Sequence, residues 1–200
     1  MSVVYFNLIL VAGPQRAVLR FRKDARQRLS PTLRKAFGTP QIDLSLDRLF
    51  RTHRLAAPSR KGLPGEDGHY HSSALPVTKW HSYDRALYEI EVKNYQIHEL
   101  LLPLSQCYGA LCFVDSEMCL DDGSIISVCV TEGRSATWAL PEKRQTAHWK
   151  RAAKRHGVAK LTDAFEDDSV RSDAEDAMLS ESLAHWDKRV LRVLGQGSRS

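Results

Sequence analysis

The sequence predicts an α+β fold: a ferredoxin-like sandwich in which helices cover a mostly antiparallel sheet, with extra helices at the C-terminal end. Three patterns predict it. Residues 3–11 are apolar on both alternating faces, as in a strand buried at the centre of a sheet. Residues 110–120 and 124–131 are rich in β-prone side chains and flank Asp122-Gly123, a strong signal for the tight turn of a hairpin. Apolar residues at helical spacing lie between and after these strands.

The first half of the chain opens with that strand, which Gly13-Pro14 ends. Proline suits the first turn of a helix because an N–H at that position would have no intrahelical partner. The helix that follows has an apolar stripe of residues about four apart, ended by Ser30-Pro31. The stripe contains Ala17, Phe21, Ala25 and Leu29. A shorter helix is expected at about 43–54, and glycines and prolines punctuate 56–78, which predicts a long loop.

The second half returns to the sheet with an alternating strand at 87–92. A helix at about 97–107 follows, and we expect Pro103 to kink or shorten it. After the hairpin, residues 141–156 are predicted to form a helix with Gly157 beyond its end. The expected order is strand, helix, short helix, long loop, strand, helix, two strands and two helices.

The chain divides into three parts in this prediction. Residues 1–157 form the α+β domain, residues 158–172 an acidic linker and residues 173–195 an amphipathic helix. Ser172 and Glu175 fit an S-x-x-E capping box at the start of that helix. The helix has one apolar stripe, formed by Leu179, Leu183, Trp186, Val190 and Leu194. Such a stripe is compatible with packing on its own domain, with self-association or with docking on a protein partner.

A series of segments resembles a known family. The opening strand runs into Gly13, and Thr78-Lys79-Trp80-His81-Ser82-Tyr83 precedes a strand, a helix and the hairpin that turns near Asp122-Gly123. This series resembles the ferredoxin-like domain of plasmid- and phage-borne proteins of the YubB type. The resemblance implies an accessory protein of a mobile element, without an assigned catalytic site. The tryptophan usual near the N-terminus of that family is absent here.

Composition argues against a secreted or membrane protein. The apolar run that opens the chain is shorter than the roughly 20 residues that cross a bilayer, and no basic residue precedes it. We therefore expect no membrane span and no secretory signal. The four cysteines form no C-x-x-C pair and are expected to be buried reduced thiols. These cysteines are Cys107, Cys112, Cys119 and Cys129. The predicted location is the cytoplasm.

The net charge of +5 is unevenly distributed, and this asymmetry suggests a function. Residues 1–60 hold twelve Lys and Arg against three Asp, residues 142–160 hold seven against one Glu, and residues 161–187 hold nine Asp and Glu against one Arg. Basic side chains neutralise phosphates, and an aromatic ring among them can stack on an exposed base. We therefore predict a non-enzymatic nucleic-acid-associated protein that contacts RNA or DNA.

The predicted contacts lie on two helices that could together form one continuous groove. On the helix at 141–156 they are Lys143, Arg144, Trp149, Lys150, Arg151, Lys154 and Arg155. On the first helix they are Arg16 and Arg20, accompanied by Arg22, Lys23, Arg26 and Arg28. Two simpler interpretations compete with this one. The basic helix is a solvated face with Trp149 covering the core, or the acidic segment folds back over it.

Two other functions stay open. An adaptor or inhibitor would act on a protein partner through the acidic segment and the final helix. A metal-dependent enzyme would use His69 and His71, which can share one ion in an extended segment, with His81 as a further ligand. Glycine-rich loops gather polar residues anyway, and no H-E-x-x-H or C-x-x-C motif occurs. The prediction therefore contains no catalytic residue and no cofactor.

Overall fold

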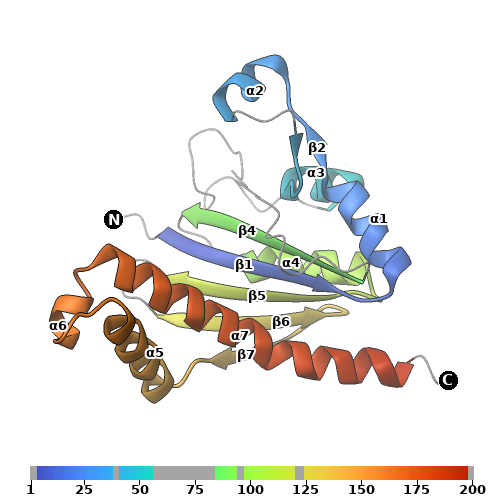
Figure 1. Ribbon diagram of the computed structural model, residues 1–200. Coiled ribbons are helices and arrows are strands. Elements are labelled where there is room, and N and C mark those ends of the chain that lie inside the picture. The colour runs from blue at the N-terminus through green and yellow to red at the C-terminus, as the bar shows by residue number, and fades with distance from the viewer. Residues whose placement is uncertain (1–3, 38–40, 56–83, 94–96, 120–123, 198–200) are drawn as a thin grey trace.

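Five strands form one antiparallel sheet with the order β4-β1-β5-β6-β7. The computed structural model describes residues 4–37, 41–55, 84–93, 97–119 and 124–197. The sheet strands are β1 (Val4–Ala12), β4 (Arg85–Lys93), β5 (Cys112–Cys119), β6 (Ile125–Thr131) and β7 (Arg134–Ala139). Helices pack against this sheet, as Figure 1 shows. The predicted α+β class and antiparallel sheet are confirmed.

The first strand is central, as its apolar pattern predicts. β1 pairs antiparallel with β4 on one side and with β5 on the other. Its alternating residues enter different cores: Ile9 and Val11 pack in one, Leu10 and Ala12 in another. The strands β4 and β5 run in the same direction on either side of β1 and are joined by α4 (Ile97–Cys107). This split β-α-β unit is the element from which ferredoxin-like folds are built.

One face of the sheet is covered by α1 (Gln15–Ala25), α3 (Leu46–Thr52) and α4. The helix α1 ends at Ala25, before the expected end of its stripe, although Leu29 is still buried. The helix α4 continues past Pro103 to Cys107, so the proline does not shorten it. These three helices and the sheet enclose the largest core, in which Phe21 and Phe113 are completely buried.

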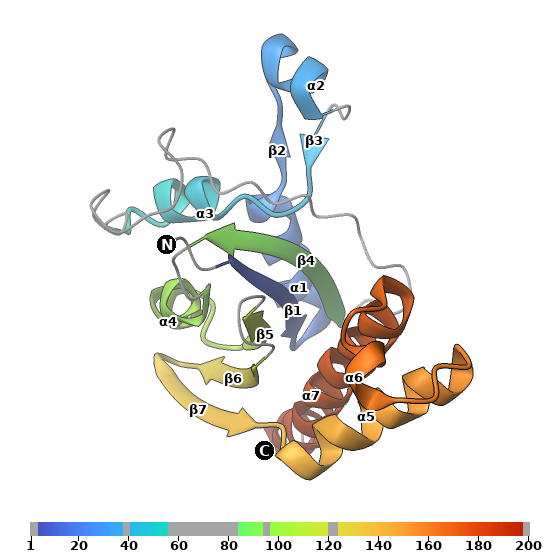
Figure 2. The same ribbon diagram turned by 90° about the vertical axis from the view of Figure 1, so that its left-hand side faces the viewer.

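The opposite face is covered by α5 (Glu142–Arg155), α6 (Leu161–Ala164) and α7 (Asp168–Gly197), as Figure 2 shows. The helix α7 starts at Asp168, before the predicted residue 173, because Asp167 Oδ1 accepts the backbone N–H groups of Ser169 and Val170 and caps the helix. The expected capping residue Ser172 therefore lies inside α7, and much of the expected linker is helical.

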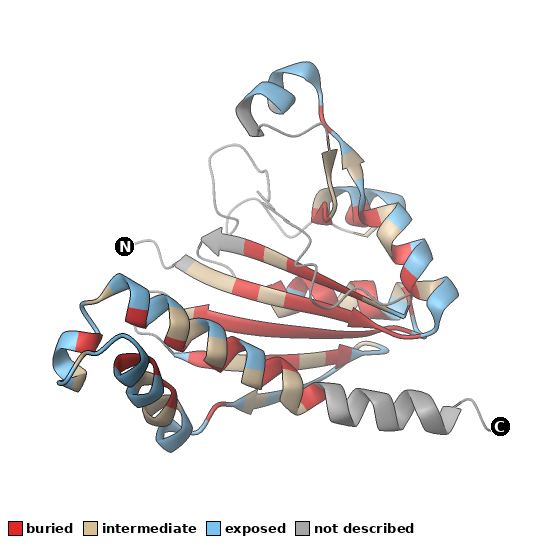
Figure 3. Ribbon diagram, in the orientation of Figure 1, coloured by how far each residue is buried: buried red, intermediate tan, exposed pale blue. Residues whose placement is uncertain are grey.

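The apolar stripe of α7 packs on its own sheet over the part where side chains are described. Leu179, Leu183 and Trp186 are buried, and the Trp186 indole N–H donates to the Ser127 hydroxyl of β6 at 2.8 Å. Figure 3 shows this burial along α7 and the burial of β5 over almost its whole length. The side chains of the last two stripe residues lie outside the described part.

Several short elements escaped the sequence prediction. The strand β7 follows β6 through Glu132 and Gly133, whose φ angles of 49° and 73° form a two-residue turn. A two-stranded sheet joins β2 (Gln27–Arg28) to β3 (Gln41–Ile42), and α2 (Pro31–Phe37) lies between them in the chain. β7 is an exposed edge strand, so it lacks the apolar alternation that marks a half-buried strand.

All four cysteines are free thiols, as predicted, although only Cys112 is fully buried. The loop predicted at 56–78 lies outside the described residues. Within the described part, the helices are too short or too polar for any of them to span a bilayer.

Candidate nucleic-acid interface

The predicted basic helix exists as α5, and its charges divide between two sides. Pro141 precedes its first turn. The small residues Ala152 and Ala153 bury one face of α5 in a second core, which lies between the sheet and the helices α5, α6 and α7. Six basic side chains are exposed: Lys143, Arg144, Lys150, Arg151, Lys154 and Arg155. Helical geometry places residues 143, 150 and 154 on the outer side and residues 144 and 155 toward α7.

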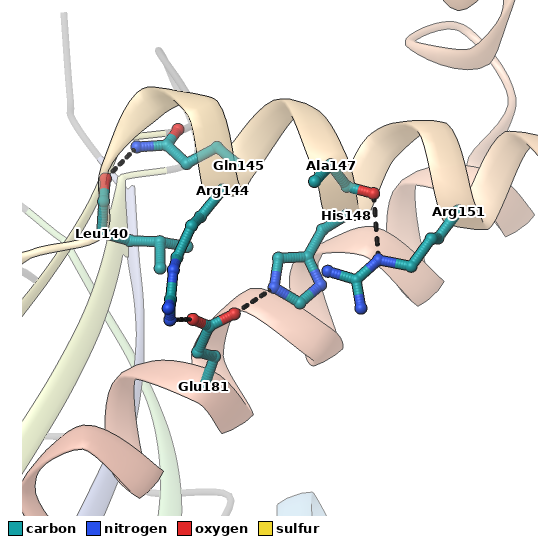
Figure 4. A network of polar contacts seen from close by, with 7 residues as sticks. All are labelled: Leu140, Arg144, Gln145, Ala147, His148, Arg151 and Glu181. Carbon is teal, nitrogen blue, oxygen red and sulfur yellow. Dashed lines mark hydrogen bonds and ion pairs between the residues drawn. The ribbon is translucent and has the colours of Figure 1, made fainter.

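The side of α5 that faces α7 is neutralised by acidic residues. Arg144 and His148 both bind the carboxylate of Glu181, His148 at 2.5 Å, as Figure 4 shows. At the C-terminal end of α5, Arg155 binds Asp173 Oδ2 at 2.6 Å. The predicted fold-back of the acidic segment is therefore correct for two of the predicted contacts, and these two arginines are engaged within the protein.

The two carboxylates respond electrostatically to these contacts. Burial raises the pKa of Glu181, but hydrogen bonds from His148 and Arg144 outweigh it and leave the pKa below its ordinary value. Hydrogen bonds from His156 and then Arg155 lower the pKa of Asp173. Both acids are thus held in the charged form that binds α5.

On the outer side of α5, Lys143, Lys150 and Lys154 make no ion pair within the described residues. Arg151 lies on the side that faces α7, close to His148, and its Nε donates to the Ala147 carbonyl of its own helix at 3.1 Å. The Trp149 ring is not fully exposed beside these basic residues. It is half-buried against the second core, with its ring edge-on to Phe165 at a centroid distance of 4.6 Å.

The other predicted contacts, Arg16 and Arg20, lie on α1 and are exposed. Arg20 makes two contacts within the protein. Its Nε lies 3.7 Å from Asp24 Oδ2 on the same helix, and its guanidinium lies 5.6 Å from the centre of the Tyr108 ring. Since α1 packs on one face of the sheet and α5 on the other, the expectation of a continuous groove across the two helices is wrong.

A different basic site appears beside α1. An open hollow of about 640 Å³ is lined by Leu19, Arg22, Lys23, Arg26, Arg28, Gln41 and Arg48. Two of its cations come from the last turn of α1, one from the residue that caps it, one from β2 and one from the first turn of α3. The pairing of β2 with β3 places Arg28 opposite Gln41 and closes one side. The volume is within the range of ligand sites, about 300–1,000 Å³.

The hollow keeps most of its positive charge. Arg26 Nε binds Asp43 Oδ1 at 3.2 Å, and Arg48 Nε donates to the backbone carbonyl of Asp24 at 2.9 Å. Among the described residues, no carboxylate forms an ion pair with Arg22, Lys23, Arg28 or Arg48. The helix dipole favours cations in the last turn of α1 but opposes one in the first turn of α3, where Arg48 lies. Five cations around one concavity therefore repel each other and favour an anionic ligand.

Four cations of this hollow, Arg22, Lys23, Arg26 and Arg28, were predicted as basic residues of the first helix. Arg48 and Gln41 were not predicted. The signal for Arg48 was the basic excess of residues 1–60, which gave no indication that α3 and β3 would approach the end of α1. The metal candidates His69, His71 and His81 lie outside the described residues.

The chain matches no protein-family model, no curated protein sequence and no solved structure. Its site must therefore be interpreted from its own geometry and charge.

Proposed function

We propose that this protein binds nucleic acid through the basic hollow between α1, β2, β3 and α3, as a non-enzymatic accessory protein. The observation that carries the proposal is the convergence of five cationic side chains on one open concavity, with a single carboxylate partner among the described residues. Lys and Arg in such an arrangement neutralise phosphates and release counterions. The exposed outer side of α5 is a second basic surface, on the opposite face of the sheet.

The alternative adaptor function receives less support. It relied on the acidic segment and the final helix being available to a partner. Asp167 caps α7, Asp173 and Glu181 bind α5, and the described part of the apolar stripe is buried on the sheet. A role in a mobile element rests only on the YubB-type resemblance and stays a proposal.

The experiment is fluorescence anisotropy with labelled single-stranded RNA, single-stranded DNA and duplex DNA over a salt series. The test variant is Lys23→Glu/Arg28→Glu, in which both replaced side chains are exposed in the hollow. We expect weaker binding and a shallower plot of log affinity against log salt. Each lost phosphate contact lowers the slope by about 0.9 for duplex and about 0.7 for single strands.

The matched control is Arg151→Glu/Lys154→Glu on α5, which changes the net charge by the same amount. If the hollow is the interface, this control keeps nearly wild-type affinity. A loss of binding in the control variant alone would show that the interface is on α5. Equal losses in both variants would show that binding depends on net charge and not on the hollow. Absence of binding to all three nucleic acids at low salt would overturn the proposed function.

A further inference from the structure

A cluster of buried polar residues lies on the sheet face that α4 covers, away from the hollow. Asp115 and Glu117 are two residues apart on β5, so they point to the same face. His98 lies in the first turn of α4, with Nδ1 3.9 Å from Asp115 Oδ2. One ligand atom from each of these three residues lies within 4.8 Å of the other two.

Burial makes the Asp115 carboxylate costly to ionise without a cation. Asp115 is completely buried, and neither of its carboxylate oxygens has a hydrogen-bond partner among the described residues. Its neighbours across the sheet are Ile9 on β1 and Val128 on β6, which provide no charge. Glu117 is also buried, at 2% exposure. A buried carboxylate needs a partner cation or must stay protonated, because ionisation in an apolar environment is strongly unfavourable.

A fourth ligand is in position on β1. Asn7 is completely buried and lies opposite Glu117 in the strand register. Its amide nitrogen donates to the Tyr5 carbonyl at 3.3 Å, and its Oδ1 has no hydrogen-bond partner. The amide is thus turned so that its oxygen, a metal-ligating atom, is the group left available.

We propose that His98, Asp115 and Glu117 bind one divalent transition-metal cation such as Zn²⁺ or Mn²⁺, with Asn7 Oδ1 as a further ligand. One imidazole nitrogen and carboxylate oxygens are ligands these ions accept. Ligand atoms about 2.0–2.2 Å from zinc in tetrahedral geometry are about 3.4 Å apart. The separations of up to 4.8 Å in the cluster therefore have to shorten when the ion binds. The ion joins the start of α4 to β5 and β1. This inference is independent of nucleic-acid binding at the hollow.

The test is calorimetric titration of the chelator-treated full-length protein with ZnCl₂ and, separately, MnCl₂. The variant Asp115→Asn removes the charge at nearly constant shape. We expect it to weaken binding by more than about 100-fold, beyond the loss typical of an outer-shell partner. In the metal-free state it should melt at or above the wild-type temperature, because a buried carboxylate is gone. This second measurement separates a lost ligand from a misfolded variant.

The matched control is Glu181→Gln, which removes a carboxylate that binds a different histidine, His148 of α5. It should bind metal like the wild type. Failure of the folded wild-type protein to bind either ion would overturn the proposal, as would wild-type affinity in Asp115→Asn. The same conclusion would follow if His69→Ala/His71→Ala abolished binding while Asp115→Asn retained it.

Discussion

The helix α1 contributes Leu19, Arg22 and Lys23 to the basic hollow, and its packing depends on Phe21. This ring is completely buried and meets three others edge-on, with centroid distances of 5.3 Å to Tyr108, 5.4 Å to Phe113 and 6.1 Å to Tyr88. Each such pair contributes about 0.5–1.5 kcal/mol beyond apolar burial. Phe21→Leu keeps most of the buried volume but removes all three pairs, so it should lower the free energy of unfolding by about 2–4 kcal/mol.

Urea denaturation followed by circular dichroism measures this change. With a slope of about 2 kcal/mol per M, the midpoint should fall by roughly 1–2 M at an unchanged slope. The control is Leu19→Ala, two residues earlier on the same helix and 42% exposed, which should change stability by less than about 0.5 kcal/mol. Equal effects of the two substitutions would refute the argument, because they would show that the three ring contacts contribute nothing specific.

Three other substitutions test single contacts. Gly133→Ala should destabilise the protein by about 1 kcal/mol or more in thermal melts, because Gly133 has a φ of 73° and an added Cβ would collide with an α4 side chain. Glu132→Asn should raise the melting temperature slightly, because asparagine tolerates the positive φ of 49° better than glutamate. The pKa of Glu181 is lowered on folding, so its stabilising contribution is present above its unfolded pKa and is lost as pH falls through the lower folded value. Glu181→Gln should therefore reduce the loss of stability measured by urea titrations between about pH 5 and pH 3.

The sequence predicted the long apolar elements because the spacing of their apolar residues indicates which faces are buried. β1 is apolar on both faces because helices cover both sides of it, and Ala17, Phe21 and Ala25 recur at the spacing of one helix face. Periodicity does not say against what a face is buried. It therefore predicted that the α7 stripe is apolar but left its packing partner open, and it gave no signal for β7, whose side chains are mostly exposed.

The candidate sites were also predicted only in part from the sequence. The charge of the α5 cations predicted that they would be exposed, whereas the ion pairs of Arg144 and Arg155 depend on how α7 packs against α5. The hollow depends on β2 and β3, which are only two residues long and below the length at which a pattern can be recognised. Asp115 and Glu117 lie two residues apart in a strand that is apolar at both ends, so the sequence places both acids on one face of that strand. Their proximity to His98 required the packing of α4 on β5.

The C-terminal helices also determine which experiments are informative. Deleting residues 161–200 looks like a direct way to separate an adaptor from a nucleic-acid-binding protein. In the structure, this deletion would expose the sheet residues Leu10 and Val114, which pack with Leu183 and Trp186 of α7. The same strand, β5, directs its next side chain, Asp115, into the core under α4. Loss of α7 would therefore perturb the sheet from which the metal cluster is built, and any loss of binding would report unfolding. Charge reversals on exposed side chains leave both cores intact, so they are the changes that distinguish the two functions.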